Sequence, residues 1–182
     1  MIIMINTNSS NIIVREMLYE DIPFIVNIYL ESFKGMQDYD IAKRWITLKF
    51  KSKPISIYYT AILDGKVIGY ILWSEHGGFR SNAVIELEQI AVGKMYRGKG
   101  VASKLIVESL RMLNRDYIAA RGARLKLVMV TTASNNNSAK GLYEKVLNAK
   151  EVATIRDFYN GNESILVARG DDIEKVIHSI ES

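Results

Sequence analysis

A strand-like run that ends in a glycine-rich turn and passes directly into a helical pattern is the most constraining feature of this sequence. Residues 83–92 (AVIELEQIAV) are typical of a strand, residues 93–100 (GKMYRGKG) contain three glycines, and residues 100–120 repeat apolar side chains at helical spacing. Such a unit is typical of folds in which helices pack on a sheet. The first turn of the helix would offer unpaired N–H groups, with their positive partial charge, to an anion.

This turn departs from both common phosphate-binding motifs. Aligned from Gly93, the segment fits the motif GxxxxGK[ST] except at the last position, where Gly100 stands in place of the Ser or Thr whose hydroxyl holds magnesium. Nucleotide hydrolysis is therefore not expected. From Gly98 it lacks the third glycine of GxGxxG, and no acidic residue ends the next strand to hold a ribose. Small residues at positions 98, 100 and 102 predict close approach of a ligand to the backbone. A plain strand-to-helix turn is the alternative.

The remaining pattern predicts an α/β (α+β) domain. Further strands are expected over residues 11–17, 56–63, 66–74, 124–131, 150–159 and 163–169, and further helices over residues 20–33, 40–50 and 138–146. Asp64-Gly65 predicts a tight hairpin between two of these strands. We expect one domain over residues 1–182, with a mixed sheet of about seven strands, helices on both faces and a core from about residue 11 to residue 169. Residues 1–10 and 171–182 are expected to be peripheral.

Composition excludes several classes of protein. The chain has 182 residues, 48% of them hydrophobic and 24% charged, which suits one globular domain. It has no cysteine, so disulfides, thiolate metal sites and a cysteine nucleophile are excluded. The opening MIIMI lacks the features of a signal peptide, and no apolar run is long enough to span a membrane, so a cytoplasmic protein is expected. The net charge of +4 is poorly clustered, so nucleic-acid binding is not expected as the main function.

Two glutamates are candidates for acid–base chemistry. Glu86 and Glu88 alternate with apolar residues, so both carboxylates project to the same side of the strand before the turn. Burying unpaired ionised groups costs several kcal/mol, so this pair predicts a cleft. A desolvated carboxylate beside a like charge suits a general base near neutral pH. Pairing with Lys or Arg, or exposure to solvent, is the alternative.

The stretch IAVGKMYRGKGVASKL resembles the acyl-CoA-binding signature of the GNAT N-acetyltransferase superfamily. There an apolar strand leads to [QR]xxGx[GA], matched here by Arg97-Gly98-Lys99-Gly100-Val101-Ala102. The order of elements resembles that family from about residue 11 to residue 169. The resemblance implies that backbone N–H groups of the turn hold the diphosphate of acetyl-CoA without a metal. It also implies pantetheine contacts along the strand, with the Ile90 N–H facing the thioester oxygen. The implied coenzyme-binding residues are Ile90, Ala91, Val92, Arg97, Gly98, Lys99, Gly100, Val101, Ala102, Ser103, Asn136 and Tyr143.

A second motif, NNSAKGLY, resembles Asn-x-x-Ala-x-x-x-Tyr of the same family, matched by Asn136, Ala139 and Tyr143. The resemblance implies that Tyr143 protonates the departing thiolate and that a glutamate of the preceding strand, Glu86 ahead of Glu88, is the base. The usual Gly-Phe after this helix is absent, since Leu147-Asn148-Ala149 stands there. A core aromatic is the alternative role for Tyr143.

Residues 158–163 (FYNGNE) resemble Tyr-Tyr-x-x-Gly-x-[DE] of the protein N-terminal branch, which includes ribosomal-protein alanine acetyltransferases. They could equally form a hairpin tip. We expect direct transfer in a ternary complex from acetyl-CoA to a protein or peptide N-terminus or a lysine. A polyamine or other small-amine acetyltransferase, or a non-catalytic CoA-binding module, is the alternative. His76 is expected in a loop, no metal site is expected, and a homodimer is among the assemblies that the sequence leaves open.

Overall fold

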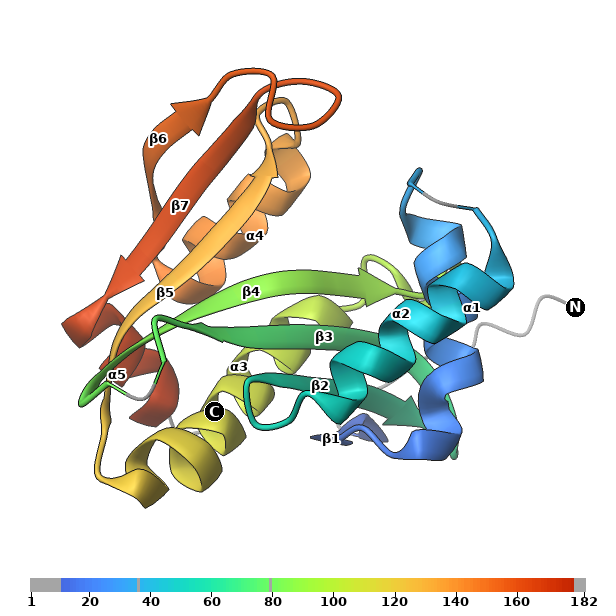
Figure 1. Cartoon of the computed structure of the whole chain (residues 1–182), viewed down its shortest axis with the longest axis horizontal. Coiled ribbons are helices and arrows are strands. Elements are labelled where there is room, and N and C mark those ends of the chain that lie inside the picture. Colours follow the sequence, from blue (N-terminus) through green and yellow to red (C-terminus); the bar gives the residue numbers. More distant parts are fainter. Residues whose placement is uncertain (1–10, 36, 79, 179–182) are drawn as a thin grey trace, which may run out of the picture.

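A seven-stranded sheet forms the centre of the computed structural model, which describes residues 11–35, 37–78 and 80–178 (Figure 1). The strand order is β1-β2-β3-β4-β5-β7-β6. Neighbouring strands are antiparallel except β4 and β5, which run parallel. The strands are β1 (Ile13–Glu16), β2 (Ser56–Leu63), β3 (Lys66–His76), β4 (Asn82–Val92), β5 (Arg124–Ala133), β6 (Lys150–Ile155) and β7 (Glu163–Arg169). The predicted mixed sheet is confirmed, while the MIIMI segment lies outside the described residues.

Helices cover both faces of the sheet, as predicted (Figure 1). On one face α1 (Ile22–Ser32) and α2 (Tyr39–Lys51) bury apolar side chains against β2 and β3. On the other face lie α3 (Val101–Leu113), α4 (Asn137–Leu147) and α5 (Gly170–His178), whose apolar side chains join the larger core. None of the helices in the described ranges is long and apolar enough to cross a membrane.

Local sequence explains several element boundaries. Pro23 lies in the first turn of α1, where its missing N–H costs no helical hydrogen bond. Asp64 and Gly65 both have positive φ, of 49° and 74°, and join β2 to β3 through the pair Leu63 and Lys66. Positive φ at both central residues belongs to the turn that matches the twist of a hairpin, so the predicted hairpin is confirmed. Asn148 ends α4 with φ of 51°, a left-handed conformation that asparagine tolerates at a helix end.

Strand β4 contains the irregularity that shapes the site. Its pairing with β3 shifts by one residue, since Leu72 faces Gln89 and Trp73 faces Leu87, which leaves Glu88 as the extra residue of a β-bulge. Pairing with β5 ends at Leu87. Beyond that residue β4 and β5 diverge (Figure 1), so the last part of β4 has one edge without a strand partner.

Three elements differ from the sequence prediction by more than a shift of two residues at either end. The helix expected over residues 100–120 ends at Leu113 and continues as a π-helical turn over Asn114–Ile118, which buries Ile118. The strand expected over residues 150–159 ends at Ile155. The C-terminal helix α5 was not predicted, and its buried Ile173 and Val176 extend the core beyond the expected limit near residue 169. Because α5 is short and of mixed polarity, too few of its apolar residues repeat at helical spacing to predict a helix.

Candidate active site

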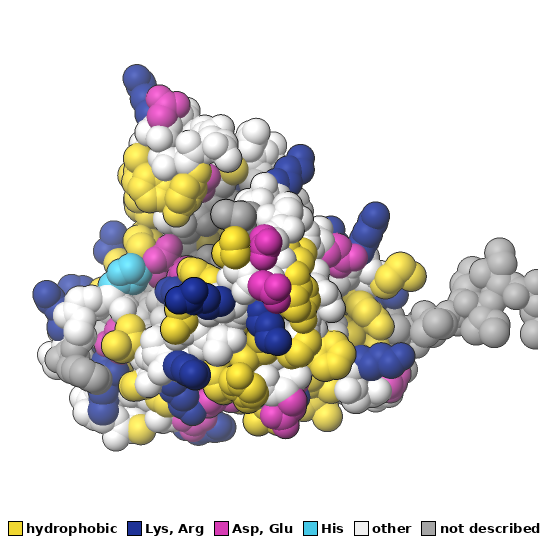
Figure 2. Space-filling view, turned by 45° about the vertical axis from the view of Figure 1, so that its right-hand side comes forward, with side chains coloured by type: hydrophobic (Ala, Val, Ile, Leu, Met, Phe, Trp, Pro, Cys, Tyr) yellow, Lys and Arg dark blue, Asp and Glu magenta, His cyan; other side chains and the backbone are white. Residues whose placement is uncertain are grey.

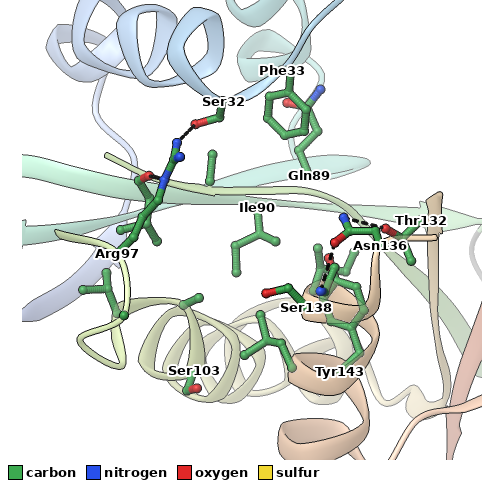
Figure 3. Close-up of a pocket in the computed structure, with 18 of the residues that line it drawn as sticks. Ser32, Phe33, Gln89, Ile90, Arg97, Ser103, Thr132, Asn136, Ser138 and Tyr143 are labelled. Carbon is green, nitrogen blue, oxygen red and sulfur yellow. Dashed lines mark hydrogen bonds between the residues drawn. The ribbon is translucent and has the colours of Figure 1, made fainter. Parts of the chain in front are cut away.

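A cleft of about 540 Å³ lies where β4 and β5 separate (Figure 3). Its lining comes from both faces of the sheet. Ser32, Phe33 and Gln89 line it on the α1 side, while Ser103, Ser138 and Tyr143 line it on the side of α3 and α4. The cleft therefore opens toward both faces of the sheet.

The glycine turn forms one wall of this cleft. Gly98 and Gly100 have φ of 73° and 79°, and a Cβ atom at either position would meet no atom within 4 Å. Glycine is thus required here for the backbone conformation rather than for lack of space. Within the described part of the chain, the N–H groups of residues 98–103 have no protein acceptor. They form a row of donors at the positive end of α3, which fits the diphosphate of coenzyme A without a metal.

Arg97 holds the turn in place. Its Nε donates to the Val92 carbonyl oxygen at 2.8 Å and its Nη2 donates to Ser32 Oγ at 2.9 Å, so one side chain joins the end of β4 to α1 (Figure 3). Lys99 points elsewhere, with its Nζ 5.9 Å from the centre of the Tyr96 ring, and does not line the cleft. The other predicted coenzyme-binding positions line it: Ile90, Ala91, Val92, Arg97, Gly98, Gly100, Val101, Ala102, Ser103, Asn136 and Tyr143.

Helix α4 supplies the opposite wall. Asn136 Oδ1 accepts from the Ala139 N–H at 3.2 Å and so caps the helix, while its Nδ2 donates to Thr132 Oγ1 at 3.3 Å. Ala139 and Tyr143 lie one turn apart and both line the cleft. Among the described residues the Tyr143 hydroxyl has no hydrogen-bond partner, and burial raises the pKa of Tyr143 to about 12. The phenol therefore stays protonated and free to donate.

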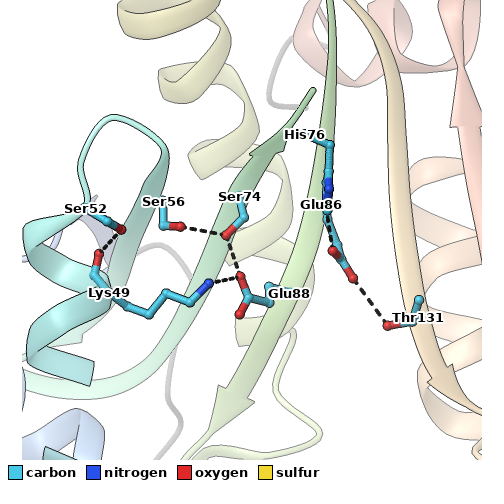
Figure 4. A network of polar contacts seen from close by, with 8 residues as sticks. All are labelled: Lys49, Ser52, Ser56, Ser74, His76, Glu86, Glu88 and Thr131. Carbon is cyan, nitrogen blue, oxygen red and sulfur yellow. Dashed lines mark hydrogen bonds and ion pairs between the residues drawn. The ribbon is translucent and has the colours of Figure 1, made fainter. Parts of the chain in front are cut away.

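The two glutamates have different surroundings (Figure 4). Glu88 lines the cleft, where its Oε2 accepts from Lys49 Nζ at 2.7 Å and from the Ser74 hydroxyl, which in turn contacts Ser56. Glu86 does not line the cleft. Its Oε2 lies 2.7 Å from His76 Nε2, and its Oε1 accepts from the Thr131 hydroxyl at 3.4 Å. Glu88 lies just beyond Leu87, where the pairing of β4 with β5 ends, so Glu88 rather than Glu86 lies at the cleft.

Sequence reasoning missed three of these side chains. His76, predicted in a loop, is the last residue of β3, which runs two residues further than expected. Lys49 lies on α2, 39 residues before Glu88, and no local pattern marks it as a partner of Glu88. Ser74 follows the buried Tyr70 and Leu72 at two-residue spacing, which places it on the same face of β3 as those residues, the face that meets Glu86 and Glu88. In the described ranges no group of three or more acidic or histidine side chains could hold a metal ion.

Comparisons with known proteins agree with one another on the kind of protein that this chain resembles. The chain is 31% identical over 120 residues to an N-alpha-acetyltransferase of Saccharolobus solfataricus, an alignment that covers 62% of this chain and 68% of that protein. The fold is similar to Ard1 from Thermoplasma volcanium, with a TM-score of 0.71, 19% identity and coverage of 87% and 97% of the two chains. It is also similar to spermidine/spermine N-acetyltransferase SpeG from Vibrio cholerae, with a TM-score of 0.68, 19% identity and coverage of 94% and 98%.

These structural likenesses show the fold alone. The model of the acetyltransferase (GNAT) family matches residues 22–149, which include the glycine turn, the bulged strand and Tyr143. That match covers most of the chain and agrees with the cleft, its row of N–H donors and the diverging strands. This protein therefore belongs to the acetyltransferase (GNAT) family.

Proposed function

We propose that this N-acetyltransferase transfers the acetyl group of acetyl-CoA to the α-amino group at the N-terminus of a peptide or protein. The observation that carries the proposal is the cleft that opens on both faces of the sheet. It would admit the coenzyme along α3 and α4 and the acceptor beside the end of α1. The similarity to an archaeal N-alpha-acetyltransferase supports this class of acceptor.

The coenzyme would be held by backbone groups. The N–H groups of residues 98–103 would bind its diphosphate, and the free edge of β4 at residues 88–92 would pair with the pantetheine arm as an added strand does. The Ile90 N–H is the proposed donor to the thioester oxygen. When bound, acetyl-CoA supplies an acetyl group on a thioester.

Two side chains would move the protons. The acceptor amine must be neutral to attack, and Glu88 is the only carboxylate of the described residues that lines the cleft, so we assign it as the proton acceptor. The amine nitrogen forms a bond to the acetyl carbon, the carbon–sulfur bond breaks, and Tyr143 gives its proton to the departing sulfur. The raised pKa of Tyr143, about 12, keeps that proton available at neutral pH.

A polyamine acceptor is the second candidate. The carboxylate of Glu88 at the cleft would attract a cation, and SpeG of Vibrio cholerae shares the fold. The two candidates are separated by incubating the protein with acetyl-CoA and either a set of unblocked peptides or spermidine, followed by mass spectrometry. We expect the mass gain of one acetyl group on peptides, located at the α-nitrogen by fragmentation. Acetylation of spermidine without acetylation of any peptide would overturn the proposal.

A further inference from the structure

A second cavity, of about 150 Å³, lies beside the cleft on the α1–α2 face of the sheet. Its walls are mostly apolar, and its lining residues are Tyr29, Ile41, Ala42, Trp45, Ile46 and Gln89. This face also carries exposed hydrophobic side chains mixed with charged ones (Figure 2), including Ile41, Trp45 and Leu48 of α2. The cavity has room for about five groups of the size of a water molecule, which is the scale of an aliphatic side chain.

Two contacts join this cavity to the cleft. Gln89 lines both of them, and Figure 3 shows it beside Phe33 at the α1 side of the cleft. Phe33 in turn stacks on Tyr29 of the second cavity, with ring centres 5.3 Å apart. The second cavity therefore adjoins the cleft, so it is the apolar neighbour of any side chain attached to an amine in the cleft.

The bulge in β4 aligns the polar groups at this junction. Glu88 and Gln89 share one face of the sheet because the bulge interrupts their alternation. The buried Tyr70 hydroxyl donates to Gln89 Oε1 at 3.1 Å, which fixes the amide. In the described part of the chain the Gln89 Nε2 has no acceptor, so it is available to a backbone carbonyl next to the amine.

The charge at the junction selects against a second cation. Lys49 Nζ lies 2.7 Å from Glu88 Oε2, at the cleft, and 5.6 Å from the centre of the ring of Trp45, which lines the second cavity, so one ammonium is already close to residues of both. Another ammonium at this position would face a like charge and an apolar wall. A lysine side chain or the second amine of a polyamine therefore fits poorly, and an uncharged aliphatic group fits well.

We propose that the second cavity binds the side chain of the acceptor's first residue and selects aliphatic side chains such as those of methionine and leucine. This inference rests on the proposed function. The acceptor amine lies at Glu88, its first carbonyl accepts from Gln89 Nε2, and its first side chain contacts Ile41 and Trp45.

The test uses the full-length protein, acetyl-CoA and peptides that differ only in the first residue: Leu, Met, Ser, Asp or Lys. We expect kcat/KM for Leu and Met to exceed that for Ser by roughly tenfold or more, since apolar pockets discriminate by such factors per side chain. Trp45→Ala should reduce the ratio of kcat/KM for the Leu peptide to kcat/KM for the Ser peptide. Ile41→Ala, tested independently, should reduce the same ratio. Leu48→Ala is the matched control, because Leu48 is exposed on the same helix and lines neither cavity.

Gln89→Leu tests the amide separately. We expect it to raise KM for all peptides while the affinity for coenzyme A is unchanged. Equal kcat/KM for all first residues in the unmodified protein would overturn the pocket assignment and leave the acceptor class standing. Acetylation of spermidine and of no peptide would overturn the acceptor class itself, so the two failures are distinguishable.

Discussion

Glu88 and Gln89 are consecutive residues of β4 whose side chains lie on the same face of the sheet. Glu88 contacts Lys49 of α2, and Gln89 contacts Tyr70 of β3 on that face. An uninterrupted strand would send them to opposite faces. The bulge therefore places a carboxylate and an amide donor side by side at the mouth of the cleft.

Glu88→Gln should lower kcat by about 10²- to 10⁴-fold, because the amide keeps the shape and the contacts of Glu88 but cannot accept a proton. The affinity for coenzyme A, measured by calorimetry, should stay the same. Glu86→Gln is the matched comparison and should change kcat by much less, since Glu86 does not line the cleft. A larger loss in Glu86→Gln would assign the base to Glu86 instead.

Tyr143→Phe should lower kcat by about 10²-fold or more, because it removes the proton donor proposed for the departing thiolate. Its free energy of unfolding should change little, since the hydroxyl has no protein partner among the described residues. Tyr117→Phe controls for the loss of a phenol, because Tyr117 donates to Glu16 away from the cleft and should leave kcat unchanged. Unaltered kcat in Tyr143→Phe would argue for a purely structural tyrosine.

Gly100→Ala should lower the free energy of unfolding by about 1–2 kcal/mol, because residue 100 has φ of 79° and a side chain is strained there. The KM for acetyl-CoA should rise as the N–H groups of the turn are displaced. Gly141→Ala is the matched control: Gly141 lies within α4, has open space around it, and alanine should stabilise the helix by about 0.5–1 kcal/mol. Equal behaviour of the two variants in denaturant unfolding and in KM would contradict the role of the turn.

Stability should fall as the pH rises above about 10, because burial raises the pKa values of Tyr58, Tyr59, Tyr70 and Tyr143. The unfolded chain loses phenol protons near pH 10, while the folded chain keeps them to higher pH, to about 12 for Tyr143. The unfolded state then binds fewer protons, so the free energy of unfolding declines with pH through this window. Denaturant midpoints measured against pH should show it.

Tyr59→Phe checks the cause of that decline. The Tyr59 hydroxyl is buried without a hydrogen-bond partner in the described structure, so its removal should leave stability at neutral pH equal or slightly higher. The decline of the free energy of unfolding at alkaline pH should become shallower, because one phenol fewer ionises differently in the folded and unfolded chains. A slope that does not change would mean that Tyr59 ionises equally in the folded and unfolded chains.

The sequence by itself determined the features that depend on neighbouring residues. Gly98 and Gly100 fixed the left-handed turn that presents N–H groups, Asp64-Gly65 fixed the β2–β3 hairpin, and the helical spacing of Ala139 and Tyr143 put both on one side of α4. Each of these depends on backbone conformation or on the period of one element, which short stretches of sequence encode.

Tertiary structure alone decided which groups meet. Glu86 and Glu88 look equivalent in the sequence, but Glu88 lies beyond the end of the pairing between β4 and β5 and lines the cleft, while Glu86 lies within the paired part and contacts His76. Lys49 reaches Glu88 across 39 positions of the chain, and the second cavity exists only because α2 packs beside Gln89. Register and packing between distant segments depend on the summed contacts of the whole core, so no local pattern could reveal them.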